Sequence, residues 1–264
     1  MAAVGAASAI VVACSTFGAD GDGVPTSDAG VDRASAEPDT EEQGDAGPSQ
    51  TCADAGFDFC DDFERDTVRG LWRSPYIAAD SGSALSITKD TSVSPSRSLA
   101  ATIPAGSAYN PAVYLSRKLA ATTRKVRVSF SLRSEEIGAD VQVVNITFAN
   151  MTYIILTLAK DGDGQSVLRA TEQRQYVDGG PDFGRTQVVT LVPLHVWVRF
   201  NISVDVASKK VTVSRDDNAP VESFPPLALD YGATDSLKVG AAYVASPRAA
   251  ARTIGFDDVF YAED

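Results

Sequence analysis

Histidine is nearly absent from this sequence: His195 is the only one among 264 residues. Cysteine is scarce as well, with Cys14, Cys52 and Cys60 as the three examples. Zinc sites are built mainly from cysteine and histidine, and two cysteines without nearby histidines do not complete one. A Ser-His-Asp triad would have to use His195, and nothing resembling a nucleophile elbow accompanies it. The sequence therefore predicts no zinc-thiolate site. It does not exclude a serine hydrolase, but no motif supports one.

Positive charge is also in short supply. There are 23 lysines and arginines against 35 aspartates and glutamates, which gives a formal net charge of −12. An acidic surface repels phosphate backbones, so no nucleic-acid partner is expected. The charge is unevenly spread, because residues 15–50 hold nine acidic residues and one basic residue, about −8 of the total.

Helical periodicity is missing too, since no run of ten or more residues shows a capped 3.6-residue pattern. A period of two stands out instead between Val196 and Arg215. The alternate apolar residues there are Val196, Val198, Phe200, Ile202, Val204 and Val206, followed after the connection 207–210 by Val211 and Val213. This pattern predicts an antiparallel hairpin with one buried face.

Similar short patterns recur along the chain and predict further strands, separated mostly by Gly, Pro, Asp, Asn or Ser. The predicted strands are 57–63, 84–88, 98–103, 112–117, 125–133, 141–149, 152–159, 166–171, 185–191, 236–244 and 253–261. About a dozen short strands indicate an all-β sandwich or barrel. In the first predicted strand the phenylalanines occupy alternate positions, and the last predicted strand shows the same alternation. We therefore expect these two strands to pair.

The first 14 residues are small or apolar, carry no charge and are too few to span a bilayer as a helix. They fit the apolar part of an export signal. The stretch Val11-Val12-Ala13-Cys14 resembles the bacterial lipobox, which implies a lipid on Cys14 and a place in the bacterial cell envelope, or secretion. The alternative is an alanine-rich, unstructured start with a chance cysteine.

A lipid on Cys14 would leave Cys52 and Cys60 to form a disulfide, as expected in an oxidising compartment. Residues 15–50 are rich in Gly, Ala, Ser, Asp, Glu, Pro and Thr and have almost nothing to bury. They are predicted to be a disordered acidic linker. The sequence thus predicts a lipoprotein-type signal over 1–14, a linker over 15–50 and one β-sandwich domain over 51–264.

Three short motifs in the domain resemble the concanavalin A-like lectin and glucanase superfamily, and within it the laminin G-like modules of bacterial envelope proteins. They are Asp61-Asp62-Phe63-Glu64 with Trp72, the Trp197 strand with its valine-rich return, and Gly255-Phe256-Asp257-Asp258-Val259. The resemblance covers the chain from Phe57 onwards. It implies a jelly-roll sandwich of two curved antiparallel sheets whose concave face often binds glycans.

The enzymes of this superfamily carry motifs that the sequence matches poorly. Its glucanases use a Glu-x-Asp-x-Glu strand, and the nearest carboxylates here, Glu135 and Glu136, are adjacent and would face opposite sides. Its alginate-lyase-like members use Gln-x-His and a tyrosine-bearing strand. Gln142 could stand for the first and 238–243 for the second, but no histidine follows Gln142.

Two carboxylates are candidate calcium ligands. In two strands expected to be neighbours, Asp62 and Asp257 point to the face opposite that of the phenylalanines. Like charges that face each other there repel unless a cation lies between them. The resemblance also implies a structural calcium there. The alternative is that both carboxylates are solvated or bind turn amides. Asp161-Gly162-Asp163-Gly164 is predicted to be a hairpin turn, because it lacks the downstream glutamate of a calcium loop.

Glycan binding needs flat rings with polar neighbours. The candidate rings are Trp72, Tyr76, Tyr109, Tyr114, Tyr153, Tyr176 and Trp197. The residues predicted to bind a ligand are Trp197, Arg199, Asn201 and Tyr243. The first hypothesis is a non-catalytic carbohydrate-binding module anchored to the envelope. A polysaccharide lyase or glycoside hydrolase of the same fold, and a structural or protein-binding surface module, are the alternatives.

Overall fold

The structure, a computed structural model, describes residues 57–68, 71–73, 75–79, 81–106, 111–119, 125–136, 138–175, 183–216, 221–222, 234–245 and 248–263. The chain divides into two compact units, 1–44 and 45–264, and every described residue belongs to the second. Cys14, Cys52 and the predicted boundaries at residues 14 and 50 lie outside the described residues. The signal, the linker and their boundaries therefore stay predictions.

The described residues form strands and no helix, which confirms the all-β prediction. The strands are β1 (Phe59–Asp61), β2 (Tyr76–Ile77), β3 (Ala84–Thr88), β4 (Ser98–Ile103), β5 (Val113–Lys118), β6 (Lys125–Ser134), β7 (Val141–Phe148), β8 (Thr152–Lys160), β9 (Ser166–Arg174), β10 (Phe183–Leu191), β11 (Val198–Asp205), β12 (Lys210–Arg215), β13 (Val221–Glu222), β14 (Thr234–Val244) and β15 (Arg252–Glu263). Sequence periodicity missed β2 and β13, because two residues cannot show a period. Across the described ranges, no helix is long and apolar enough to cross a membrane.

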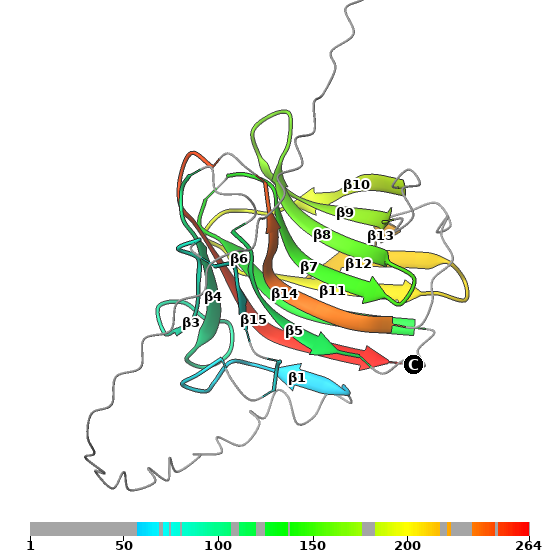
Figure 1. Ribbon diagram of the computed structural model, residues 1–264, viewed down its shortest axis with the longest axis horizontal. Coiled ribbons are helices and arrows are strands. Elements are labelled where there is room, and N and C mark those ends of the chain that lie inside the picture. The colour runs from blue at the N-terminus through cyan, green and yellow to red at the C-terminus, as the bar shows by residue number, and fades with distance from the viewer. Residues whose placement is uncertain are drawn as a thin grey trace, which may run out of the picture. The chain divides into compact units, whose positions relative to one another are not determined.

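The strands form two antiparallel sheets, as Figure 1 shows. Sheet A has eight strands in the order β13-β12-β11-β6-β15-β4-β3, with β1 also paired to β15. Sheet B has seven strands in the order β10-β9-β8-β7-β14-β5-β2. The two sheets enclose one hydrophobic core that includes phenylalanines, valines and leucines from both. This arrangement is the predicted two-sheet sandwich.

The hairpin predicted from the period of two is the β11–β12 pair of sheet A. Its register runs from Phe200 opposite Arg215 to Asp205 opposite Lys210. Along β11 every second residue from Val198 is buried, and the residues between are partly exposed. Val196, which precedes the strand, is exposed. The alternation arises because successive side chains of a strand point to opposite faces.

The first and last strands pair as predicted: β1 lies antiparallel to β15, with Phe59 opposite Tyr261. On the same edge, β4 pairs with the earlier part of β15, from Arg252 to Phe256. The pairing of β15 with β6 on its other side shifts register between Asp257 and Phe260. The two aspartates of the closing motif therefore lie at an irregularity between two strand partners.

The opening motif forms a hydrogen-bonded clip next to β1. The Asp61 carboxylate accepts hydrogen bonds from the backbone N–H of Phe63 at 2.9 Å and from Nη1 and Nη2 of Arg65 at 2.7 and 2.6 Å. It also accepts one from the indole N–H of Trp72. The Trp72 ring packs edge-on against Phe59, with centroids 4.9 Å apart. Asp61 thus holds the N-terminal segment of the domain against the core.

Strand β14 bends along its length beside β7 (Figure 1). The register between these two strands shifts between Val239 and Tyr243. Gly240 lies within this shift with φ of +131°, and a Cβ there would come within 2.7 Å of the Val113 carbonyl oxygen. Only glycine permits both this φ and the close approach of β5. The glycine and the bulge account for the bend.

Candidate functional site

The four residues predicted to bind a ligand do not share one surface. Trp197, Arg199 and Asn201 lie at or along β11, on the outer face of sheet A, the side turned away from the core. Tyr243 lies on β14, on the outer face of sheet B. Because these are the outer faces of two different sheets of a sandwich, the four side chains cannot contact one ligand. The set is corrected to two separate groups.

The sheet A group is engaged with the protein itself. The ring of Trp197 covers Gly255, where an added Cβ would lie 2.8 Å from ring atom Cη2. The Arg199 guanidinium lies 4.9 Å from the ring centroid of Phe260, and its Nε donates to Ser129 Oγ at 3.1 Å. These contacts give the two side chains a structural role.

Sheet B presents a more varied outer face, which we call the tyrosine-lysine face. Its side chains come from β5, β7, β8 and β14, where they alternate with core residues, and from β2, which pairs with β5: Tyr76, Tyr114, Ser116, Gln142, Asn145, Tyr153, Lys238 and Tyr243. These residues lie far apart in the sequence. What brings them together is the strand order of sheet B.

Lys238 is at the centre of this face. In register it lies opposite Ser116 on one side and Asn145 on the other. Its ammonium is 5.3 Å from the ring centroid of Tyr114, and the Tyr114 ring stacks on Tyr76 with centroids 4.8 Å apart and planes 21° apart. A cation over an aromatic ring is attracted by the negative face of the ring. The result is an aromatic pair with a cation beside it.

The electrostatics of the face follow from burial. Burial lowers the pKa of Lys238, and the nearby Asp235 only partly offsets this. Burial raises the pKa of Tyr114, and Tyr76 adds to the effect. Burial also raises the pKa of Tyr153. Both phenols therefore stay protonated at neutral pH, so each can donate a hydrogen bond.

The structure places Gln142 directly opposite Tyr243 in the β7–β14 ladder. The Tyr243 side chain is 40% exposed. The position two residues after Gln142, where the Gln-x-His motif needs its histidine, is Val144, which is fully buried in the core. Two elements of the lyase-like pattern thus meet across two strands, and the histidine element is missing.

His195 lies elsewhere, in the turn before β11. Its backbone N–H donates to the Ser134 carbonyl at 2.9 Å, and its Nδ1 is 2.7 Å from Glu135 Oε2. Glu135 also pairs with Arg133 at 2.7 Å. Although burial acts to raise it, the contacts with His195 and Arg133 hold the pKa of Glu135 below its usual range. These contacts tie the turn to the end of β6.

The predicted calcium ligands lie at the irregularity of β15. Asp257 is fully buried and its carboxylate is saturated: Oδ2 accepts the backbone N–H groups of Val93 and Ser94 at 2.7 and 3.0 Å, and Oδ1 accepts Ser94 Oγ and the Asp258 N–H at 2.8 Å each. Four hydrogen bonds occupy the four lone-pair positions of a carboxylate. For Asp257 the geometry favours the alternative of turn amides as partners.

Asp62 and Asp258 differ from Asp257, because Asp62 Oδ2 and Asp258 Oδ1 are buried without a hydrogen-bond partner. Burial and the charges of Asp257, Asp62 and Glu64 raise the pKa of Asp258 to about 6, against the opposing charge of Arg199. Within the described ranges, no group of three or more histidine, cysteine or carboxylate side chains is arranged to hold a metal ion. A calcium ion here would have to draw its remaining ligands from carbonyl oxygens or water.

Other predicted sites have plainer outcomes. Asp161 Oδ1 accepts the N–H groups of Asp163 and Gln165 at 3.0 and 2.7 Å, so this segment is the predicted hairpin turn between β8 and β9. Cys60 is disulfide-bonded. The pairing with Cys52 stays a prediction, because Cys52 lies outside the described residues, as do the candidate rings of Tyr109 and Tyr176.

Comparisons with solved structures agree on the fold. An endo-β-1,4-glucuronan lyase from the fungus Trichoderma reesei matches with a TM-score of 0.59 and 14% identity over 79% of this chain and 96% of that one. The cellulose-induced protein Cip1 matches with a TM-score of 0.54 and 15% identity over 78% and 97%. A glycoside hydrolase family 16 enzyme for mixed-linkage glucan from Bacteroides ovatus matches with a TM-score of 0.53 and 11% identity over 77% and 99%.

Comparison with protein families finds no match, and comparison with curated proteins finds none either. The structural matches nevertheless cover nearly the whole of each neighbour. The fold is the concanavalin A-like jelly roll, as the short motifs had indicated.

Proposed function

We propose that this concanavalin A-like domain binds a polysaccharide on its tyrosine-lysine face. The observation that carries the proposal is the stacked Tyr76–Tyr114 pair with the Lys238 ammonium 5.3 Å from the Tyr114 ring. A sugar ring offers an apolar C–H face and a rim of hydroxyls, so it suits an aromatic platform flanked by donors and acceptors. Asn145 and Gln142 supply such groups on the neighbouring strand.

The names of two neighbours of the same fold agree with a polysaccharide as the ligand class. One is named as a lyase of glucuronan, and another was solved with a glucan product. At identities of 11 to 15%, similarity to these proteins supports the fold alone. The assignment to a polysaccharide therefore rests on the chemistry of the face.

The test begins with a glycan-array screen of the purified protein, followed by titration calorimetry with the best ligand. Tyr114→Ala and Lys238→Ala are each expected to weaken binding about tenfold, because each removes a central contact of the platform. Asn201→Ala, on the outer face of sheet A, is the matched control and is expected to bind like the wild type. Equal loss in the control, or unchanged binding in both test variants, would contradict the proposal.

A polysaccharide lyase is the second candidate, favoured by the register that sets Tyr243 opposite Gln142 on the same face as Lys238, whose pKa is lowered by burial. In such a β-elimination a base takes the proton from C5 of a uronic acid, a C4–C5 double bond forms, and the C4–O bond breaks as the leaving oxygen takes up a proton. Product analysis of the array ligand separates the cases: an ultraviolet-absorbing unsaturated product indicates a lyase, and new reducing ends without it indicate a hydrolase. Binding without cleavage supports the first proposal, and silence across the array supports a structural or protein-binding module.

We also propose that the protein is anchored to the bacterial envelope by a lipid on Cys14, with residues 15–50 as its acidic tether. The support is the uncharged apolar stretch that ends in Val11-Val12-Ala13-Cys14. On detergent phase partition, the wild type expressed in a bacterium is expected in the detergent phase and Cys14→Ser in the aqueous phase. The same partition for both would count against the anchor.

A structural calcium ion is proposed at the irregularity of β15, held by Asp62 and Asp258 instead of the saturated Asp257. The support is the pair of buried carboxylate oxygens without hydrogen-bond partners. Calcium binds carboxylate and carbonyl oxygens, so it would neutralise this cluster and tie β1 to β15.

A further inference from the structure

The strands of sheet B carry an excess of positive charge, although the whole chain has a formal net charge of −12. They contain seven basic residues, which are Arg117, Lys118, Lys160, Arg169, Arg174, Arg185 and Lys238. They contain two acidic residues, Glu172 and Asp235. A local excess of one sign attracts ligands of the opposite sign. Only the charges on the outer face can meet a ligand on the tyrosine-lysine face.

Three of the basic residues point to the core side of the sheet. The Arg117 guanidinium lies 4.1 Å from the ring centroid of Phe59, a core residue. Arg185 pairs with Glu172, which is fully buried. Arg174 lies two residues beyond Glu172 on β9, so its side chain points to the same side. These three charges cannot meet a ligand on the outer face.

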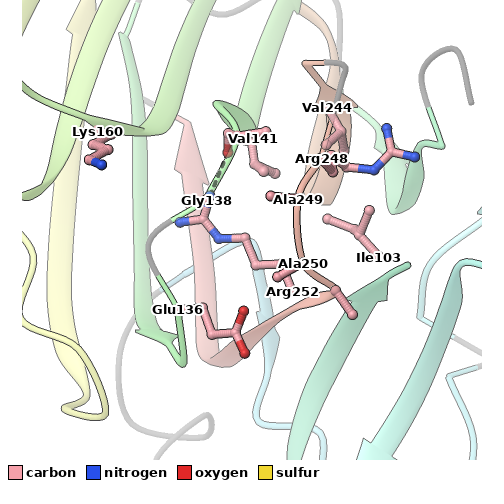
Figure 2. A pocket seen from close by; sticks show the side chains of 12 residues that line it. Ile103, Glu136, Gly138, Val141, Lys160, Val244, Arg248, Ala249, Ala250 and Arg252 are labelled. Carbon is pink, nitrogen blue, oxygen red and sulfur yellow. Dashed lines mark hydrogen bonds between the residues drawn. The ribbon is translucent and has the colours of Figure 1, made fainter. Parts of the chain in front are cut away.

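Lys160 belongs to a different surface. With Arg248 and Arg252 it lines a hollow where the segment between β14 and β15 meets the ends of β4 and β7. Figure 2 shows the Arg252 side chain crossing one side of this hollow, whereas the Arg248 guanidinium points away from it. None of the lining residues belongs to the tyrosine-lysine face. The charges of the hollow are therefore separate from that face.

The three remaining basic residues, Lys118, Arg169 and Lys238, point to the outer face. Lys118 follows Ser116 by two residues on β5, and Arg169 alternates with core residues of β9. The charge of Arg169 is balanced, because its Nη1 pairs with Asp140 at 3.5 Å. Within the part of the chain that the structure describes, neither Lys118 nor Lys238 forms an ion pair. Two lysines thus supply the uncompensated charge of the face.

Lys238 is a partly desolvated cation with neutral neighbours. Across the two ladders it lies opposite Ser116 and Asn145. Burial lowers the pKa of Lys238, and Asp235 opposes this without forming an ion pair among the described residues. The ammonium nitrogen is not one of the buried polar atoms that lack a hydrogen-bond partner, so a ligand can reach it. An anion compensates such a cation better than a neutral hydroxyl does.

Lys118 provides a second cation close to the first. It lies opposite Ser236, while Lys238 lies opposite Ser116, so the two lysines are diagonal neighbours on adjacent strands. Diagonal neighbours in an antiparallel sheet are about 7–8 Å apart. Lys118 is exposed, so its ammonium is accessible as well. Two cations at this separation suit acidic groups that recur along a polymer.

We propose that the polysaccharide bound on the tyrosine-lysine face is anionic, with carboxylate or sulfate groups that pair with Lys238 and Lys118. The inference rests on the proposed polysaccharide function and adds the charge of the ligand to it. The stacked Tyr76–Tyr114 pair contacts the apolar face of a sugar ring, and the two ammonium groups contact acidic groups on the rims of the sugar units. A neutral polysaccharide makes only the first of these contacts.

The test is affinity electrophoresis of the full chain in gels that contain matched polymers: carboxymethyl and hydroxyethyl cellulose, polygalacturonate and its methyl ester, and dextran sulfate and dextran. In at least one pair, the anionic polymer is expected to retard the protein at a concentration at least about tenfold below that of the neutral one. The first two pairs report on carboxylates and the third on sulfates.

The outcomes separate this inference from the function on which it rests. Equal retardation by the two members of each pair, or retardation by neutral polymers alone, would overturn the inference and leave polysaccharide binding standing. Retardation by none of the polymers would also overturn it, and the glycan-array screen then decides on polysaccharide binding by itself.

Variants that change only charge locate the contact. Lys238→Gln is expected to weaken binding of the anionic polymer at least about tenfold, whereas Lys238→Arg keeps the charge and is expected to retain most of the binding. Should Lys238→Gln fail to fold, Lys118→Gln replaces it, with an expected loss of about threefold because this lysine is exposed. Lys89→Gln, an exposed lysine after β3 of sheet A, changes the net charge equally and is the matched control. Equal loss in Lys89→Gln, or undiminished binding in the test variant, would contradict the assignment.

Discussion

Replacing Asp61 with alanine is expected to destabilise the domain by about 3–5 kcal/mol, the cost typical of removing one partner from a buried ion pair. The Asp61 carboxylate is 1% exposed and accepts hydrogen bonds from Arg65, Phe63 and Trp72. Alanine would leave these donors without their acceptor in a region closed to water. Urea denaturation followed by circular dichroism measures the loss, and tryptophan fluorescence is expected to shift to the red as Trp72 loosens.

The matched control for this prediction is Asp66→Ala. Asp66 also pairs with an arginine, Arg97, at 2.5 Å, but its side chain is 86% exposed. An exposed pair of this kind contributes about 0–1 kcal/mol because water screens it. The contrast between the two aspartates is therefore the result that matters. Equal denaturation midpoints for Asp61→Ala and Asp66→Ala would show that the Asp61 clip does not hold the N-terminal segment of the domain in place.

Asp258→Asn is expected to have the opposite effect and to stabilise the metal-free domain at pH 7 by about 2–3 kcal/mol. Asp258 is 3% exposed, and burial and the charges of Asp257, Asp62 and Glu64 raise its pKa to about 6. Each unit of pKa shift corresponds to about 1.4 kcal/mol between the two protonation states. Asparagine removes the charge and tolerates the positive φ of +47° at this position.

The pH dependence of this effect has a definite sign. Because the folded pKa lies above the unfolded value near 4, protonated Asp258 favours the folded state at low pH. That contribution is lost as the pH rises from about 4 to about 6. The stability gap between Asp258→Asn and the wild type should therefore open over this window in EDTA. Asp216→Asn is the control, since Asp216 also has a positive φ, of 51°, but lies in an exposed pair with Arg215.

Calcium would reverse this result. With the ion bound to Asp62 and Asp258, the negative charge becomes an advantage, and added calcium raises the melting temperature of the wild type by mass action. Asp258→Asn is then expected to lose the calcium response while keeping its stability in EDTA. If calcium shifts both proteins equally, Asp258 is not a ligand. If it shifts neither, the calcium proposal fails and the cluster is a destabilising set of buried charges.

The strands were predictable from the sequence because their signal is local. A strand with one buried face alternates apolar and polar residues whatever its neighbours are, so β11 and β12 are visible in Val198, Phe200, Val211 and Val213 without any structure. The fold class followed from the number and spacing of such strands. The pairing of β1 with β15 was predicted because phenylalanines occupy alternate positions in both strands, and the structure confirms it.

The candidate site was predictable only in part. The sequence drew attention to Trp197, Arg199 and Asn201 because they share a face of the strongest strand. The structure shows Trp197 lying over Gly255 and Arg199 over Phe260. Parity within a strand reveals which residues share a face. It does not reveal whether the side chains on that face already pack against residues of a neighbouring strand.

The alternation of apolar and polar residues by itself determined the all-β class and the hairpin, because each strand buries alternate side chains, and the short motifs indicated the jelly-roll sandwich. Only the tertiary structure decided that Tyr76, Tyr114, Lys238 and Gln142 share one outer face, since that depends on the order β2-β5-β14-β7 in sheet B. It likewise decided that Asp257 is saturated while Asp62 and Asp258 keep unpartnered oxygens. Strand order and hydrogen-bond satisfaction are properties of contacts between distant segments, and no local period encodes them.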